Sequence, residues 1–287
     1  RRLIVNSSSM KRLFVLSFVM FIVATAMYAQ PTTPSAPRQD GIYKRTLLGT
    51  REIIPYDDIR EADIYWEKRI WRNIDFREKI NLAFTWPVDP FVQIVYDAVV
   101  SGELKAYSPL YDDFSEGTEL PLEQIIIKFN RTDTTWILDE ETYEEKPVII
   151  KTEFDYQTVQ KIQIKEDWVF DEETSTMVVR IIGLTMIRDR IDPTTGETLG
   201  SEPMFWIYYP DLRGIIIRHE VFNEKNSARY LTFEDIFEMR LFSSYIVKED
   251  NVYDRFIENY TSGIDQVLES ERIKQQIFDF EHNLWEF

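Results

Sequence analysis

Histidine and carboxylate side chains are the groups in this sequence that could do acid–base chemistry, and their numbers are very unequal. The 287 residues include two histidines but 50 aspartates and glutamates. His219 alternates with Ile215, Ile217 and Val221, which predicts a partly buried, hydrogen-bonded histidine rather than a catalytic base. His282 lies among acidic residues of the last predicted helix and is expected at the surface.

Motifs for metal or nucleotide chemistry are missing from the sequence. It has no cysteine, no H-x-x-x-H pair, no EF-hand loop and no phosphate-binding glycine motif. We therefore predict no catalytic residue, no metal ligand and no cofactor. A carboxylate-dependent hydrolase stays open as an alternative, because two acidic side chains about 5–9 Å apart would suffice. With so many carboxylates, the sequence cannot single out such a pair.

The charge of the chain excludes two classes of partner. The formal net charge is −17, and residues 1–29 contain four basic residues and no acidic one, so residues 30–287 carry −21. Nucleic acids and anionic lipid surfaces are bound through a basic footprint, which so acidic a protein lacks. We expect no nucleic-acid partner and no direct membrane insertion.

The beginning of the sequence has the pattern of an export signal. Lys11 and Arg12 follow Met10, and an apolar run extends from 13 to 26. Cleavage is expected after Ala29, with a second small-residue site at 24–26, and residues 1–9 would precede the true start. The apolar run is short for a spanning helix, which needs roughly 20 apolar residues. Residues 1–29 are thus predicted to be a signal peptide, and 30–50 a flexible, proline-rich tail.

Hydrophobic periodicity divides the remainder into a core domain, 51–248, and an acidic helical region, 249–287. Apolar residues at steps of three and four predict a helix over 57–74, and a second helix is expected over 90–101, with Asp89 as its cap, Pro90 in its first turn and Gly102 as its stop. From about 122 to 222 the period becomes two, which predicts strands joined by short turns, including one at 210–214. Thr232 and Asp235 form a capping-box pattern that opens further helices. The predicted fold is α+β: N-terminal helices, a central antiparallel β meander and C-terminal helices.

One basic, tryptophan-containing segment stands out on this acidic chain. Five basic residues fall within 68–79, whereas region 249–287 has ten acidic residues against three basic ones. Head-to-tail contact between these regions of neighbouring copies would be favourable and could generate a ring or filament. Pairing of the same basic residues inside one molecule is the alternative. Arginine and tryptophan are favoured at interfaces, so the predicted partner-binding residues are Trp66, Arg69, Trp71, Arg72 and Arg77.

At this segment the sequence resembles a known family, and further matching stretches extend the similarity over about residues 51–256. The first motif comprises Arg60-Glu61-Ala62-Asp63, Trp66, Lys68-Arg69-Ile70-Trp71-Arg72, Ile74-Asp75 and Arg77-Glu78-Lys79-Ile80-Asn81. The others are Glu166 to Asp171, Arg180 to Gly183, Phe205 to Pro210, and Arg240 to Ile246 with Tyr253 to Arg255. The chain is similar to GldN/PorN, the periplasmic ring protein of the Bacteroidetes type IX secretion and gliding-motility machinery.

This resemblance implies a non-enzymatic role in the periplasm. Members of the family assemble with an outer-membrane lipoprotein, GldK/PorK, into a large ring, and they contact the periplasmic part of the inner-membrane motor protein GldM/PorM. The ring supports protein export across the outer membrane. A periplasmic hydrolase and a periplasmic ligand-binding module are the alternative functions.

Overall fold

The structure is a computed structural model that describes residues 51–284 except 112, 130, 139–144, 153, 192–197, 224–225 and 227–230. The predicted signal peptide and the proline-rich tail lie outside these residues. So does the stretch Asp192-Pro193-Thr194-Thr195-Gly196, a sequence that predicts a turn. The main strands are β1 (Ile64–Asp75), β2 (Ala106–Tyr107), β5 (Val159–Asp171), β6 (Thr176–Ile191), β7 (Thr198–Tyr208) and β10 (Tyr245–Glu249). The smaller ones are β3 (Arg131–Leu138), β4 (Glu145–Thr152), β8 (Glu220–Val221) and β9 (Leu231–Thr232). The helices are α2 (Phe91–Ser101), α3 (Leu122–Phe129), α4 (Tyr209–Ile216), α5 (Phe233–Glu238) and α6 (Ile264–Asn283), together with short 3₁₀ segments that include η3 (Lys79–Thr85), η5 (Tyr156–Thr158) and η6 (Ile257–Asn259).

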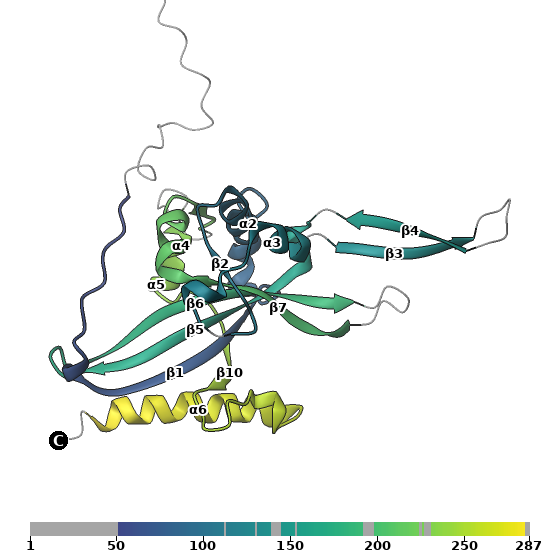
Figure 1. Ribbon diagram of the computed structural model, residues 1–287. Coiled ribbons are helices and arrows are strands. Elements are labelled where there is room, and N and C mark those ends of the chain that lie inside the picture. Colours follow the sequence, from purple (N-terminus) through teal and green to yellow (C-terminus); the bar gives the residue numbers. More distant parts are fainter. Residues whose placement is uncertain are drawn as a thin grey trace, which may run out of the picture. The chain divides into compact units, whose positions relative to one another are not determined.

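A six-stranded antiparallel sheet organises the molecule, in the order β10-β1-β5-β6-β7-β2 (Figure 1). Strands β5, β6 and β7 form the predicted meander. Strand β6 is antiparallel to β5, and β7 is antiparallel to β6, so consecutive strands lie side by side. Strands β3 and β4 pair only with each other among the described strands. The α+β fold class with a central meander is therefore confirmed.

The first predicted helix is wrong, because residues 64–75 form strand β1. Trp66, Ile70 and Ile74 are spaced by four residues, and four is both close to one helical turn and an even number. Such a stripe places the three side chains on one face in either conformation. The aromatic and β-branched residues of the segment favour a strand, and β5 offers a partner along nearly the whole length of β1.

Helix α2 confirms the second predicted helix, with a different cap. Gly102 follows it with a φ of 80°, a left-handed conformation that suits glycine. The N-cap residue is Pro90 rather than Asp89. The Asp89 carboxylate instead contacts His219, at 2.9 Å from its Nδ1.

Two further helices replace expected strands and turns. Residues 122–129 form α3, and Tyr209–Ile216 form α4 where a turn and the start of a strand were expected. Each helix has a proline at its start, Pro121 or Pro210, a position at which the missing N–H is not needed. In α4, Leu212 and Ile216 are four residues apart and both are completely buried, so packing against the sheet fixes the helix.

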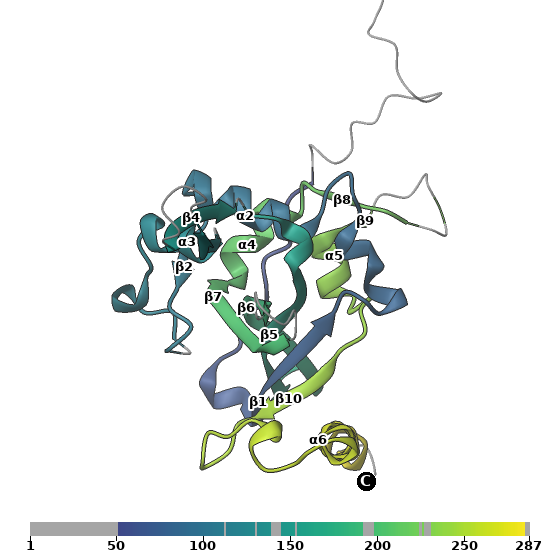
Figure 2. The same cartoon turned by 90° about the vertical axis from the view of Figure 1, so that its right-hand side faces the viewer.

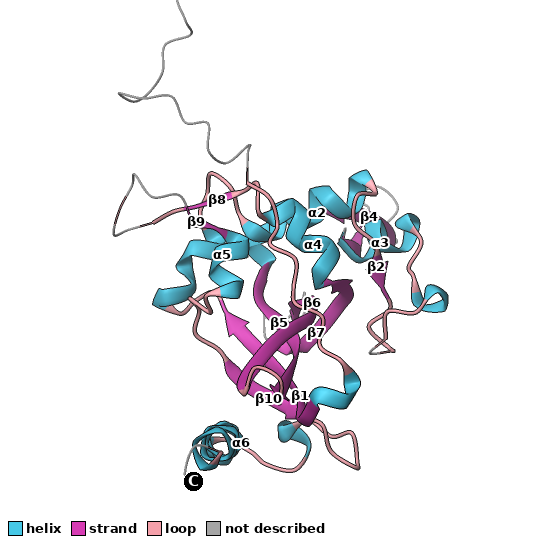
Figure 3. Cartoon of the chain, turned by 90° about the vertical axis from the view of Figure 1, so that its left-hand side faces the viewer, coloured by secondary structure: helices cyan, strands magenta, loops and turns pink. Residues whose placement is uncertain are grey.

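Helices α2, α3, α4 and α5 gather on one side of the sheet and enclose the main core, whereas α6 lies apart (Figure 3). Phenylalanine rings fill the middle of the core, with Phe91 5.6 Å from Phe84 and 5.2 Å from Phe233 between ring centroids.

The predicted capping box of α5 is confirmed, since the Thr232 hydroxyl accepts from the Asp235 N–H and the Asp235 carboxylate accepts from the Thr232 N–H.

Helix α6 packs against β1 and β10 (Figure 2). Its side chains Ile273 and Ile277 are buried against Ile70 and Ile246 in a second, smaller apolar cluster. The Ser270 hydroxyl also accepts a hydrogen bond of 2.9 Å from the Ile246 N–H on edge strand β10.

The opposite edge of the sheet, strand β2, is covered by the segment that follows it. The Leu120 N–H donates to the Ala106 carbonyl, and the Ser108 N–H donates to the Thr118 carbonyl, both at 2.8 Å. Backbone groups at this edge are therefore also satisfied within the chain.

Candidate functional site

Arg72, one of the predicted partner-binding residues, belongs to a buried ionic network. Its Nε lies 3.4 Å from the carboxylate of Glu166, which is completely buried. Arg240 donates to the same carboxylate at 2.8 and 3.2 Å, and the Trp168 indole donates at 3.0 Å. Burial lowers the pKa of Arg72, and the charge of Glu166 partly opposes that effect. Arg72 on β1 is therefore paired inside one molecule with a carboxylate of the neighbouring strand β5.

Trp71 points to the other face of β1 and is also buried. Its indole is 5% exposed, and the Nζ of Lys248 lies 4.2 Å from the ring centroid. Lys165 approaches the same ring at 5.8 Å. Both lysines are almost completely buried, and cation–π contact is strongest where water is excluded. Trp71 thus contributes to an internal layer of aromatic rings and lysines and presents little area to a partner.

Trp66 and Arg69 have partners in the same chain but keep part of their surface. The Trp66 ring stacks on Phe280 of α6, with centroids 4.6 Å apart. Arg69 donates twice to the Asp167 carboxylate, at 2.6 and 2.7 Å, and its side chain is 39% exposed. Lys68 pairs at 2.6 Å with Glu249, the first residue of the acidic C-terminal region. The alternative of pairing within the chain thus holds for these basic side chains.

The three arginines among the predicted partner-binding residues all form ion pairs, and Arg77 is the most exposed of them. It lies just beyond β1, and 61% of its side chain is exposed. Its Nε and Nη2 donate to the Asp75 carboxylate, and these hydrogen bonds hold the pKa of Asp75 below its usual range. The five predicted residues therefore lie on both faces of β1 and beyond its end, and do not form one patch. Their role in partner binding stays a prediction.

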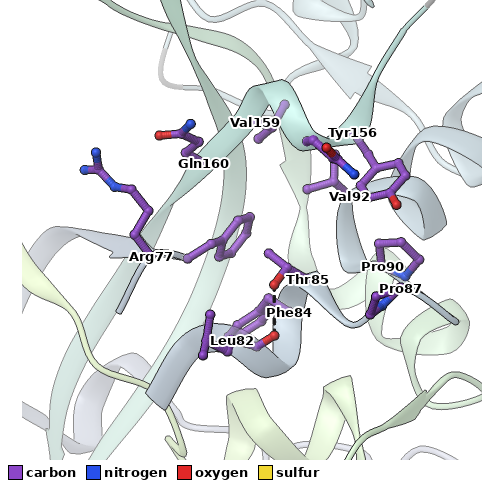
Figure 4. A pocket seen from close by; sticks show the side chains of 12 residues that line it. Arg77, Leu82, Phe84, Thr85, Pro87, Pro90, Val92, Tyr156, Val159 and Gln160 are labelled. Carbon is purple, nitrogen blue, oxygen red and sulfur yellow. Dashed lines mark hydrogen bonds between the residues drawn. The ribbon is translucent and has the colours of Figure 1, made fainter. Parts of the chain in front are cut away.

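An apolar pocket opens beside Arg77 (Figure 4). Its volume is about 420 Å³, within the range of small-ligand and side-chain pockets. Arg77 and Gln160 lie at one side of it and Pro87, Pro90 and Tyr156 at the other, as Figure 4 shows. The complete lining consists of Phe76, Arg77, Leu82, Phe84, Thr85, Pro87, Pro90, Val92, Tyr156, Gln157, Val159 and Gln160.

Sequence reasoning missed this pocket because its two halves are distant in the chain. Residues 76–92 and 156–160 meet only because β1 pairs with β5, and the Phe76 N–H donates to the Gln160 carbonyl at 2.9 Å. In the sequence, Arg77 and the prolines that follow it at 87 and 90 were the one signal for this pocket. They do not identify its opposite wall, which residues 156–160 form.

A second, shallower hollow of about 250 Å³ contains His219. The predicted partly buried, hydrogen-bonded histidine is confirmed, since its side chain is 34% exposed and bonded to Asp89. Asp97 and Glu103 also line this hollow. Within the described residues, no three histidine, cysteine or acidic side chains are placed to hold a metal ion.

None of the helices in the described part of the chain is both long and apolar enough to cross a membrane.

The fold and its pockets define an α+β protein that has an apolar pocket with an arginine at its rim. The family model described as "Gliding motility associated protein GldN" matches residues 59–286, which include every strand of the main sheet and all of α6. The chain belongs to this GldN family. No curated protein matches it.

Proposed function

We propose that this chain is a non-enzymatic structural subunit of the type IX secretion and gliding machinery. The observation that carries the proposal is the GldN family match over residues 59–286, because it spans the whole sheet and α6 rather than one motif. The predicted export signal adds support, since it would direct the chain into the periplasm.

The partners we propose are those implied by the family resemblance. The chain assembles with an outer-membrane lipoprotein of the GldK/PorK type into a ring, and it contacts the periplasmic part of a motor protein of the GldM/PorM type. In this proposal the lipoprotein holds the ring at the outer membrane. The ring then supports export of proteins across that membrane.

Deletion and co-purification test the proposal. Deleting the gene is expected to abolish export across the outer membrane, and the reintroduced chain is expected to restore it. Purified chain is expected to co-elute with the lipoprotein as large particles. Normal export in the deletion strain, or a chain that stays monomeric in the presence of the lipoprotein, would contradict the proposal.

A ligand-binding module is the second candidate, and the pocket beside Arg77 is the observation that favours it. Its lining is mostly apolar with few polar groups, as in small-molecule sites. The residues that line it include no carboxylate, so this pocket gives no support to the hydrolase alternative. A small molecule that co-purifies with the chain, and is lost on changing Leu82 to glutamate, would favour the module over the ring subunit.

A further inference from the structure

The pocket beside Arg77 has the composition of a seat for aromatic side chains. Its floor and walls come from η3, the start of α2 and η5, and include the buried rings of Phe76 and Phe84. Leu82 on its rim is 49% exposed, although it is a large apolar residue. Among the described residues that line the pocket, Arg77 alone is charged. A suitable occupant therefore combines aromatic rings with a negative charge.

The sequence just after α6 has this combination. Trp285, Glu286 and Phe287 follow Leu284. In an extended segment, residues two apart point to the same side, so both rings could enter one pocket while Glu286 faces its rim. Aromatic side chains bury about 150–250 Å² each. Glu281 and Asp279 on α6 add further negative charge close to this segment.

Chain geometry excludes the pocket of the same molecule. Phe280 stacks on Trp66 near the start of β1, whereas the pocket lies beyond Asp75 at its end. At about 3.3 Å per residue, β1 spans roughly 30 Å between those two positions. Phe287 is seven residues beyond Phe280, which is at most about 25 Å even for a fully extended chain. Figure 1 shows the end of α6 beneath the start of β1, so the chain leaves the helix at the end of the sheet remote from the pocket.

We propose that residues 285–287 of one copy bind in the Arg77 pocket of the next copy. This inference rests on the proposed assembly of copies into a ring and specifies one contact of that ring. The two contacting surfaces are different, so the contact is heterologous and repeats from copy to copy, as a closed ring or a filament requires. The rings of Trp285 and Phe287 supply the apolar contact.

Electrostatics favour the same pairing. The copies are strongly acidic and repel one another, with a formal net charge of −17 for the whole sequence. Asp75 occupies the Nε and Nη2 side of Arg77, and most of the guanidinium side chain remains exposed. A guanidinium has five N–H donors, so it can bind the carboxylate of Glu286 in addition to Asp75.

The first experiment compares aromatic residues inside and outside the proposed segment. Self-association of the full chain, with and without the lipoprotein partner, is measured by sedimentation velocity. The double variant Trp285→Ala with Phe287→Ala is expected to weaken assembly by about tenfold or more, because buried aromatic anchors dominate interfaces. Phe278→Ala is the matched control: this ring on α6 is 60% exposed and lies outside residues 285–287, and its loss is expected to leave assembly unchanged.

The pocket side is tested by Leu82→Glu, alone and combined with the double variant. Leu82→Glu is expected to weaken assembly as strongly as loss of the two rings. The combination is expected to cost no more than either change alone, because both remove one contact. Additive losses, or unchanged assembly in either variant, would show that residues 285–287 do not bind in this pocket.

A cross-linking experiment identifies which molecule provides the segment. The sequence contains no cysteine, so introduced thiols are unambiguous. Chains with Gln157→Cys, at the pocket, are mixed with chains carrying Asn283→Cys, at the end of α6, and treated with a short thiol cross-linker. Cross-links between the two kinds of chain are expected, and a chain with both changes is expected to form a ladder of oligomers. Cross-links only within single chains would overturn the proposal.

The failure of this contact is distinguishable from failure of the proposed function. If the chain assembles with the lipoprotein and the segment variants assemble equally well, the ring subunit stands and the contact is wrong. If the unaltered chain never associates with itself or with the lipoprotein, both are wrong.

Discussion

The two apolar clusters of this molecule lie on the same face of β1 and β5 but differ in kind. The main cluster is enclosed by α2 to α5 and includes Ile74 and Ile164, whereas the second is covered by α6 and includes Ile70. Between them, on the same side of the two strands, lie Arg72 and Glu166. A long sheet face is thus divided by an ionic network into a large core and a smaller one. The smaller core can loosen without loss of the larger one, because burial there depends on α6 and the short segment η6.

Breaking the network between the clusters is expected to have the largest effect. Arg72→Glu would place a second carboxylate beside completely buried Glu166 and leave both without adequate compensation. The free energy of unfolding is expected to fall by about 3–5 kcal/mol, which urea denaturation measures. If Arg72 bound a partner, as the sequence predicts, the same change would weaken assembly and leave the fold intact. The buried position of Arg72 instead predicts a loss of stability.

Arg69→Glu is the matched control for Arg72→Glu. Arg69 also pairs with a carboxylate of β5, but its side chain is 39% exposed, so its loss is expected to cost about 1 kcal/mol or less. Equal losses for the two variants would contradict the view that burial distinguishes the two arginines.

Removing apolar volume from the smaller core is expected to have the next largest effect. Ile273 is completely buried between α6 and the sheet, and Ile273→Ala is expected to cost about 2–3 kcal/mol, the lower part of the range for such changes, because α6 can move to fill the space. Hydrogen exchange is expected to increase in α6 and β10 and not in β6. Ile162→Ala, in the main core, is expected to increase exchange throughout the sheet, and the same local pattern for both variants would contradict the division into two cores.

A substitution on the opposite face of the sheet is expected to have a smaller effect on stability. A Cβ on Gly183 would lie 2.3 Å from the Phe114 ring, which packs over this glycine. Gly183→Ala is expected to destabilise the fold by about 1–2 kcal/mol, because the ring must be displaced from Tyr107 and Trp206. Thermal denaturation measures the loss, and it should largely disappear when Phe114 is already replaced by alanine. A loss of the same size in that background would show that the ring is not the cause.

The smallest expected effect is a pH dependence at α5. Burial would raise the pKa of Asp235, but hydrogen bonds from Arg51 and Thr232 prevail and lower it. A carboxylate with a lowered pKa in the folded state contributes stability above its unfolded pKa of about 3.9, and this contribution is lost as the pH falls through the folded value. Because Arg51 is partly exposed, the contribution is expected to be about 1 kcal/mol or less.

Asp235→Asn tests this contribution. The variant is expected to be less stable than the parent at pH 6 and to lose less stability between pH 5 and pH 2.5. Parallel stability curves for parent and variant over that interval would show that Asp235 does not titrate as described.

The elements that were predicted correctly are those whose spacing of apolar residues fits only one type of secondary structure. Ile162 and Ile164 alternate with polar residues, and β5 follows that alternation. The stripe of Trp66, Ile70 and Ile74 fits both a helix and a strand, and only the partner strand decides between them. Local pattern also fails where packing selects the conformation, as in α4.

The candidate site was predictable only in part. Arg77 could be found because a basic residue on an acidic chain is conspicuous. Arg72 looked equivalent in sequence, since nothing local reveals that Glu166, which also pairs with Arg240, neutralises it inside the fold. The pocket beside Arg77 required the pairing of β1 with β5, which no local pattern specifies.

Backbone groups at both edges of the main sheet have hydrogen-bond partners within the chain, and this limits how copies of this protein can join. A donor on β10 is taken by the Ser270 hydroxyl, and β2 is hydrogen-bonded along its outer side to residues 118–120. A free edge strand would invite open-ended growth by strand addition. Where these groups are occupied, strand addition is less favourable, so contacts through side chains and pockets become the easier route, and such contacts can be selective for a single partner and can come apart again.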